Sequence, residues 1–174
     1  MPGRLVYWDS CIFIAWLKDE QRPDPLDLDG IAYLVEEWDA GRLVIATSTI
    51  TRIEVLESSL TPDQAAQFKL ALRRSTMRVD AATSPVTDLA HDLRNYYADP
   101  RLSTPDAIHM ATAIAAGCDT FFTFDGTDPS DRKKARKLLP LGPSLLGQYT
   151  LAIAPPRRPA TKQAPLPFPP LKKH

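Results

Sequence analysis

Four acidic residues are spaced so that a fold of alternating strands and helices could gather their carboxylates: Asp9, Glu54, Asp106 and Asp125. Carboxylate oxygens bind hard divalent cations, and Mg²⁺ keeps several waters, so one or two carboxylates suffice for each ion. Two such ions about 4 Å apart can activate a water on one side of a phosphodiester and stabilise the leaving oxygen on the other. We therefore expect metal-assisted hydrolysis, a chemistry that needs no histidine base.

Two of these acids directly follow predicted strands. The runs 4–8 and 120–124 are short and rich in strand-forming residues, and Asp9 and Asp125 come immediately after them. In a parallel sheet, ligand sites form outside the carboxyl ends of the strands. Both carboxylates are therefore expected at one edge of the sheet.

The other two acids are expected in helices that begin near that edge. A strand at 43–47 should lead into a helix from about residue 48 or 49 to residue 60, which contains Glu54. Asp106 lies in the first turn of a helix predicted at 105–116. Because helices that follow parallel strands start at the same edge of the sheet, all four carboxylates should converge on one pocket.

Each acid taken alone also has a simpler structural explanation. Asp9 can cap the helix that follows it, and Glu54 can complete a capping box with Thr51. Asp106 can complement the helix dipole, while Asp125 precedes glycine in an ordinary turn dipeptide. The coincidence of four placements at one edge is what favours a shared site.

Five neighbouring residues could assist such a site: Ser10, Glu57, His109, Thr123 and Asp128. Ser10 and Thr123 flank the acids at the strand ends and could orient a carboxylate or a water, or bond only to local backbone. His109 shares a helix face with Asp106, although a packed histidine is the simpler interpretation. Glu57 lies three positions after Glu54, about one helical turn, and could serve in its place.

The chain as a whole alternates strands with helices. Apolar periodicity and turn residues predict helices at 11–18, 30–39, 62–74, 85–97, 105–116 and, rich in basic residues, 131–138. Strands are predicted at 4–8, 43–47, 77–79, 120–124 and 148–153. Thr61, Ser84 and Thr104 each precede a proline, so a hydroxyl can cap a helix whose first turn holds that proline. This order predicts an α/β fold with a mostly parallel central sheet flanked by helices.

Charge is unevenly distributed along the 174 residues, although the net charge is zero. Residues 155–174 carry five lysines and arginines, seven prolines and no acid. We therefore expect one folded domain over 1–154, followed by a Pro-rich basic tail that is extended or disordered. A second basic cluster lies at 132–137.

Several protein classes are excluded by motifs that the sequence lacks. It contains no glycine-rich dinucleotide turn and no nucleotide-hydrolysing phosphate loop, and its three histidines lack zinc spacing. Cys11 and Cys118 are too few for a disulfide framework. No apolar run approaches the roughly 18 to 20 residues that span a bilayer, and Asp9 interrupts the first apolar stretch too early for a signal peptide. We therefore expect a cytoplasmic protein.

Four segments, in order over about residues 4–125, resemble the PIN-domain family and within it the VapC-type toxin ribonucleases: Val6–Ser10, Ser48–Val55, Thr104–Ala113 and Phe122–Asp125. The third segment is the most specific, because its acid heads a helix of small residues. The resemblance implies a three-layer α/β fold of the PIN type. It also implies that the catalytic, metal-holding residues for Mg²⁺ or Mn²⁺ are Asp9, Glu54, Asp106 and Asp125.

The resemblance implies a divalent-metal-dependent endoribonuclease that hydrolyses RNA, is neutralised by a cognate antitoxin protein and forms a homodimer. Two alternatives stay open, namely an inactive PIN-like binding module and a PIN ribonuclease of RNA processing that is not a toxin. We expect the cluster at 132–137, together with Arg73 and Arg74, to contact RNA phosphates. The basic tail is expected to contact RNA or to fold over the acidic groove.

Overall fold

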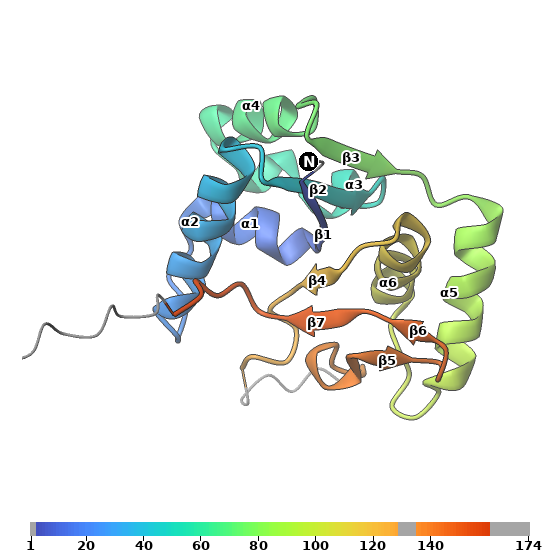
Figure 1. The fold of residues 1–174 in the computed structure, drawn as a ribbon. Coiled ribbons are helices and arrows are strands. Elements are labelled where there is room, and N and C mark those ends of the chain that lie inside the picture. The colour runs from blue at the N-terminus through green and yellow to red at the C-terminus, as the bar shows by residue number, and fades with distance from the viewer. Residues whose placement is uncertain (1–2, 129–134, 161–174) are drawn as a thin grey trace, which may run out of the picture.

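A central sheet of five parallel strands organises the computed structural model, which describes residues 3–128 and 135–160 of the chain (Figure 1). The strand order is β3-β2-β1-β4-β7, with β1 in the middle. The bounds are β1 (Arg4–Trp8), β2 (Leu43–Ser48), β3 (Met77–Asp80), β4 (Thr120–Phe122) and β7 (Ala152–Ala154). A separate antiparallel pair consists of β5 (Ser144–Leu145) and β6 (Tyr149–Thr150).

Helices cover both faces of this sheet. Helices α1, α2 and α4 lie on one face, and α5 and α6 lie on the other (Figure 1). The bounds are α1 (Ser10–Lys18), α2 (Leu26–Asp39), α3 (Thr51–Glu54), α4 (Pro62–Ala71), α5 (Ser84–Tyr96) and α6 (Thr104–Ala116), with 3-10 turns η1 (Glu57–Ser59) and η2 (Leu139–Leu141). The predicted α/β architecture of three layers is therefore confirmed. Within the part of the chain that the structure describes, no helix is both long and apolar enough to cross a membrane.

The two cores are separated by the alternation of side chains along β1. Val6 and Trp8 pack with the α1–α2–α4 layer, whereas Tyr7 packs with the α5–α6 layer, and all three are fully buried. Strands covered on both faces read as continuous apolar runs, which is why residues 4–8 show no polar alternation. The middle strand is thereby fixed in register with β2 and β4.

The predicted helix from residue 48 or 49 to residue 60 is wrong. Only the single turn of α3 and the short 3-10 turn η1 form there, and the backbone leaves the helical region at Val55, between them. The Val55 side chain is 1% exposed because it packs into the α1–α2–α4 core. The capping box that would be the simpler explanation of Glu54 is absent, because the N-cap of α3 is Ile50 and the Thr51 hydroxyl lies 2.7 Å from the Thr47 hydroxyl. Burial of these two side chains overrides the local preference for a longer helix.

Smaller differences occur at element ends. Thr61 caps α4 as predicted, but Ser103 rather than Thr104 caps α6. The predicted strand at 148–153 is divided into β6 and β7 around the buried Leu151. Of the predicted basic helix, residues 131–134 lie outside the described residues, and residues 135–138 are not helical.

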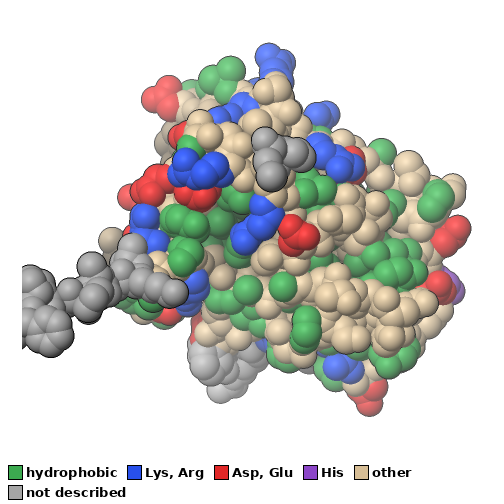
Figure 2. Space-filling model, viewed as in Figure 1, with side chains coloured by type: hydrophobic (Ala, Val, Ile, Leu, Met, Phe, Trp, Pro, Cys, Tyr) green, Lys and Arg blue, Asp and Glu red, His purple; other side chains and the backbone are tan. Residues whose placement is uncertain are grey.

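Residues 155–160 continue from β7 and lie along α2. Arg157 pairs with Asp24 and Asp27, and Arg158 pairs with acids on the exposed face of α2. Side chains of both charges accordingly meet over α2 in Figure 2. A Cβ at Gly30 would lie 2.2 Å from the Pro156 carbonyl oxygen, so only glycine permits this approach. These two arginines thus pair with acids in and just before α2. The rest of the tail, which we expected to contact RNA or to fold over the acidic groove, lies outside the described residues.

Candidate active site

One pocket gathers the four acids that the sequence singles out. Its volume is about 380 Å³ and it is lined by Asp9, Ser10, Cys11, Ile14, Glu54, Asp106, Phe124 and Asp125. The carboxylates come from the β1–α1 junction, from α3, from the first turn of α6 and from the loop after β4. Because β1, β2 and β4 are parallel neighbours, the segments that follow them begin at the same sheet edge.

Asp9 both caps α1 and lines the pocket, so the two interpretations of this residue are compatible. Its Oδ1 accepts a hydrogen bond of 2.7 Å from the Ser10 backbone N–H. Its Oδ2 accepts one of 2.7 Å from the Thr123 hydroxyl and a longer one of 3.3 Å from the Cys11 thiol. Three donors therefore hold a carboxylate that is 8% exposed in one orientation.

Glu54 is held by a chain of hydrogen bonds that reaches into the core. The Nε2–H of His109 donates to Glu54 Oε2 over 2.6 Å, and the Ser10 hydroxyl donates to the same oxygen. On the other side of the ring, Nδ1 lies 2.7 Å from the Tyr7 hydroxyl. Burial by itself lowers the pKa of His109, but the hydrogen bond to Glu54 and the negative charge of Asp9 outweigh it and raise the pKa above its ordinary value. His109 therefore supports the acid, although it lines no part of the pocket.

The remaining two acids are positioned by their own loops. The Ser103 hydroxyl donates to Asp106 Oδ2 and accepts from the Asp106 backbone N–H, so the α6 cap also orients this carboxylate. The Asp125 backbone N–H donates to the Thr123 hydroxyl over 3.1 Å. Lys137 Nζ lies 3.8 Å from Asp125 Oδ1, which brings one cation of the predicted basic cluster to the acidic site.

Two of the five neighbouring candidates, Glu57 and Asp128, do not line the pocket. Glu57 pairs with Lys69 over 2.9 Å instead. Sequence reasoning missed the roles of Cys11 and Tyr7 beside these acids. Position gave a signal for both, because Cys11 lies in the first turn after Asp9 and strand alternation turns Tyr7 toward α6.

The donor set of this pocket suits a hydrated divalent cation. Among residues 3–128 and 135–160, no three His, Cys, Asp or Glu side chains are gathered closely enough to complete a metal site by themselves. An ion held by one or two carboxylates would complete its coordination with water, which is the mode that Mg²⁺ prefers. Four acids around one small pocket repel one another and attract cations.

The family model of the PIN domain matches residues 6–127, which include all four acids. This match covers most of the chain and the whole of the acidic pocket. The chain belongs to the PIN domain family. No sequence among the curated proteins matches this PIN domain.

Solved structures share the fold at low sequence identity. A chain of a toxin–antitoxin complex from Klebsiella pneumoniae is 23% identical with a TM-score of 0.52, covering 76% of this chain and 96% of its own. VapC20 of Mycobacterium tuberculosis, a toxin that cleaves the sarcin-ricin loop, is 19% identical with a TM-score of 0.52, covering 70% and 90%. A chain of VapBC2 from Rickettsia felis, bound to a promoter DNA fragment, is 18% identical with a TM-score of 0.51, covering 68% and 86%. At these identities the likeness establishes the PIN fold.

Proposed function

We propose that this PIN domain is a divalent-metal-dependent endoribonuclease that hydrolyses RNA phosphodiester bonds. The observation that carries the proposal is the convergence of four carboxylates from distant segments on one pocket. Acids gathered in this way repel one another, and bound cations would relieve that repulsion. The catalytic residues of the proposal are Asp9, Glu54, Asp106 and Asp125.

The same four residues would hold Mg²⁺, or Mn²⁺ in its place. A bound ion would lower the pKa of water and offset the negative charge of the phosphodiester. Thr123 keeps Asp9 in place, and His109 keeps Glu54 turned toward Ser10. Lys137 is close enough to the pocket to help to attract the phosphate backbone.

We also propose that the protein is the toxin of a VapBC-type toxin–antitoxin pair. The support is the fold, which it shares with VapC20 and with chains of two toxin–antitoxin assemblies. Its partners would be RNA as substrate, a cognate antitoxin protein and a second copy in a homodimer, all in the cytoplasm. Co-expression with the reading frame adjacent to its own gene, followed by co-purification, tests the antitoxin, and light scattering tests the dimer.

Cleavage of total RNA tests the enzymatic proposal. The full chain should cleave RNA with Mg²⁺ and lose this activity with EDTA. Asp106→Asn should lower the rate by more than about 100-fold, which exceeds the usual cost of losing an outer-shell metal partner. Asp119→Asn, at the opposite end of β4, is the matched control and should cleave like the wild type. Undiminished cleavage by Asp106→Asn would remove this residue from the site, and wild-type protein without RNase activity would refute the proposal.

Thermal stability gives a second, independent readout of the metal. Millimolar Mg²⁺ or Mn²⁺ should raise Tm, because an ion at 100 times its Kd adds about 2.7 kcal/mol, or roughly 5–10 °C for a chain of this size. Asp106→Asn should show a smaller rise. An identical melting curve with and without either ion would contradict the metal site.

A further inference from the structure

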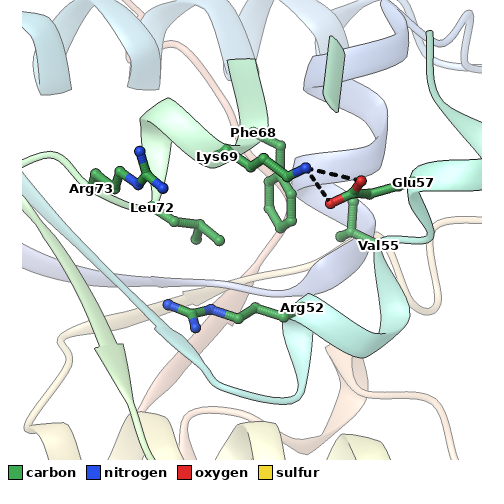
Figure 3. A pocket seen from close by; sticks show the side chains of 7 residues that line it. All are labelled: Arg52, Val55, Glu57, Phe68, Lys69, Leu72 and Arg73. Atoms are coloured by element: carbon green, nitrogen blue, oxygen red, sulfur yellow. Dashed lines mark hydrogen bonds and ion pairs between the residues drawn. The ribbon is translucent and has the colours of Figure 1, made fainter. Parts of the chain in front are cut away.

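A second pocket lies between α3 and α4 and shares no lining residue with the acidic pocket. Its volume is about 280 Å³, near the lower end of small-molecule sites, and it is lined by Arg52, Val55, Glu57, Phe68, Lys69, Leu72 and Arg73. The buried side chains of Val55 and Phe68 form its floor. In Figure 3 the guanidinium groups of Arg52 and Arg73 lie on one side with Leu72 between them, and the Lys69–Glu57 pair lies on the other.

The charge of this pocket is positive and partly uncompensated. Its lining holds three cations and one acid, and that acid is bound by Lys69. Within residues 3–128 and 135–160, neither Arg52 nor Arg73 has a side-chain hydrogen bond or ion pair. Six other arginines of the described residues have carboxylate partners, namely Arg22, Arg42, Arg74, Arg78, Arg157 and Arg158. Arg94 and Arg136 donate to backbone carbonyl oxygens instead.

Arg73 and Arg74 are neighbours in the sequence, but only Arg74 has a carboxylate partner. It was expected to contact phosphate together with Arg73, but it pairs with Asp39 over 2.7 Å and stacks on Trp38 at 3.9 Å. Its neighbour Arg73 turns toward α3 and faces Arg52 across Leu72 (Figure 3). Two guanidinium forks over an apolar floor suit a phosphate group, because each fork can donate two parallel hydrogen bonds to it.

The position of Arg52 connects this pocket to the acidic one. Arg52 and Glu54 are two residues apart in the same turn of helix, so their side chains leave it about 200° apart. A helix with its side chains is about 10 Å across. A nucleic-acid strand advances about 3.4 Å per nucleotide when stacked, so about three nucleotides span the distance from one pocket to the other.

We propose that the α3–α4 pocket binds a backbone phosphate of the RNA strand about three nucleotides from the bond that is cleaved, with Arg52 and Arg73 as its ligands. This inference rests on the proposed nuclease function. The acidic pocket would recognise phosphate through bound cations and Lys137, and the α3–α4 pocket adds fixed positive charge further along the strand. A phosphate contact of this kind positions the strand without specifying its sequence.

The salt dependence of RNA binding tests the inference. Anisotropy of a fluorescent 12-nucleotide single-stranded RNA would be measured with the full chain in Ca²⁺, at several salt concentrations. Removing the contact with this one phosphate should make the slope of log K against log salt about 0.7 less negative, since each neutralised phosphate of a single strand contributes about 0.7. Arg52→Ala/Arg73→Ala should show this change and weaker binding, and Arg52→Lys/Arg73→Lys, which keeps both charges, should retain the slope.

Arg4→Ala/Arg42→Ala is the matched control, because it removes two exposed charges at the amino end of the sheet. Its slope should equal that of the wild type, and melting curves should show all variants folded. An unchanged slope for Arg52→Ala/Arg73→Ala, while the wild type still cleaves RNA, would overturn the pocket proposal alone. If the slope changes but the wild type cleaves no RNA, the α3–α4 pocket still binds RNA phosphate and the proposed nuclease activity is refuted. The same variants would also be tested for binding to a fluorescent poly-glutamate decamer. If Arg52→Ala/Arg73→Ala lost binding to this decamer but not to RNA, the proposal would be overturned in favour of an acidic protein partner.

Discussion

The Tyr7 hydroxyl and His109 show how a core side chain reaches the candidate site. Tyr7 is fully buried on β1, and its hydroxyl is linked to Glu54 through the imidazole that it contacts over 2.7 Å. Helix spacing places His109 on the same face as Asp106, but it cannot show that the ring turns toward Glu54, 55 positions earlier. His109 is 1% exposed, so the simpler interpretation of a packed histidine is correct. In addition, its ring contacts Glu54.

Tyr7→Phe should destabilise the fold and loosen Glu54. The change leaves Nδ1 of a buried ring without its partner, which costs about 1–2 kcal/mol, or roughly 2–8 °C in Tm. Tyr96→Phe is the matched control, because Tyr96 is 64% exposed and should melt like the wild type. Circular dichroism melting measures both variants. A Tyr7→Phe protein with unchanged Tm would show that this hydrogen bond contributes nothing.

Cys118 gives a prediction that depends on pH. Burial raises the pKa of its thiol to about 12 from 9.0, so the reactive thiolate is about a thousandfold rarer in the folded chain. At pH 8, iodoacetamide should label Cys118 in urea but hardly at all in native protein, as peptide mapping by mass spectrometry can show. Because the folded pKa is the higher one, the thiol's contribution to stability is present below pH 9 and is lost as the pH rises toward 12. Equal labelling rates in native and unfolded protein would contradict this.

At the scale of elements, one buried acid of α2 binds both the segment that precedes this helix and the C-terminal segment after β7. Asp27 is 1% exposed and binds Arg22 over 2.9 Å as well as Arg157 from the C-terminal segment. Arg22 in turn lies over the Phe124 ring at 3.7 Å, next to the candidate site. The sequence marks 155–174 as basic and proline-rich, but charge alone cannot tell which acids its arginines will meet.

Arg157→Ala should therefore destabilise the protein much more than Arg158→Ala. Loss of Arg157 leaves a buried carboxylate with one partner, at a cost of about 2 kcal/mol. Arg158 pairs with exposed acids, and such pairs contribute little because water screens them. Urea unfolding of the two neighbouring variants compares them directly. A similar free energy of unfolding for both would contradict the importance of the buried pair.

At the scale of the whole molecule, the folded domain extends beyond the residues that the PIN family model matches. The family match ends at residue 127, whereas β7 pairs with β4 and completes the sheet. Leu138, Leu145 and Leu151 are also buried in the α5–α6 core. Each leucine of this kind stabilises a fold by about 2 kcal/mol or more.

A chain truncated after Thr127 should lose cooperative unfolding. It would expose one edge of β4 and the part of the core that these three leucines cover. Differential scanning calorimetry of the truncated and full-length chains measures the change, and truncation after Ala160 is the control that keeps every described contact. A truncated chain with the cooperative transition of the full protein would show that residues 135–160 are dispensable.

The sequence by itself determined the α/β class, the order of most helices and strands, and the four acids at element ends, because period and turn chemistry act over a few residues. The tertiary structure alone decided that α3 is one turn, since the burial of Val55 depends on α1 and α4. It also decided that His109 reaches Glu54 and that Arg157 reaches Asp27. The first pair is separated by 55 positions in the sequence and the second by 130. Contacts over such separations depend on how the sheet and helices pack, and no local pattern encodes that packing.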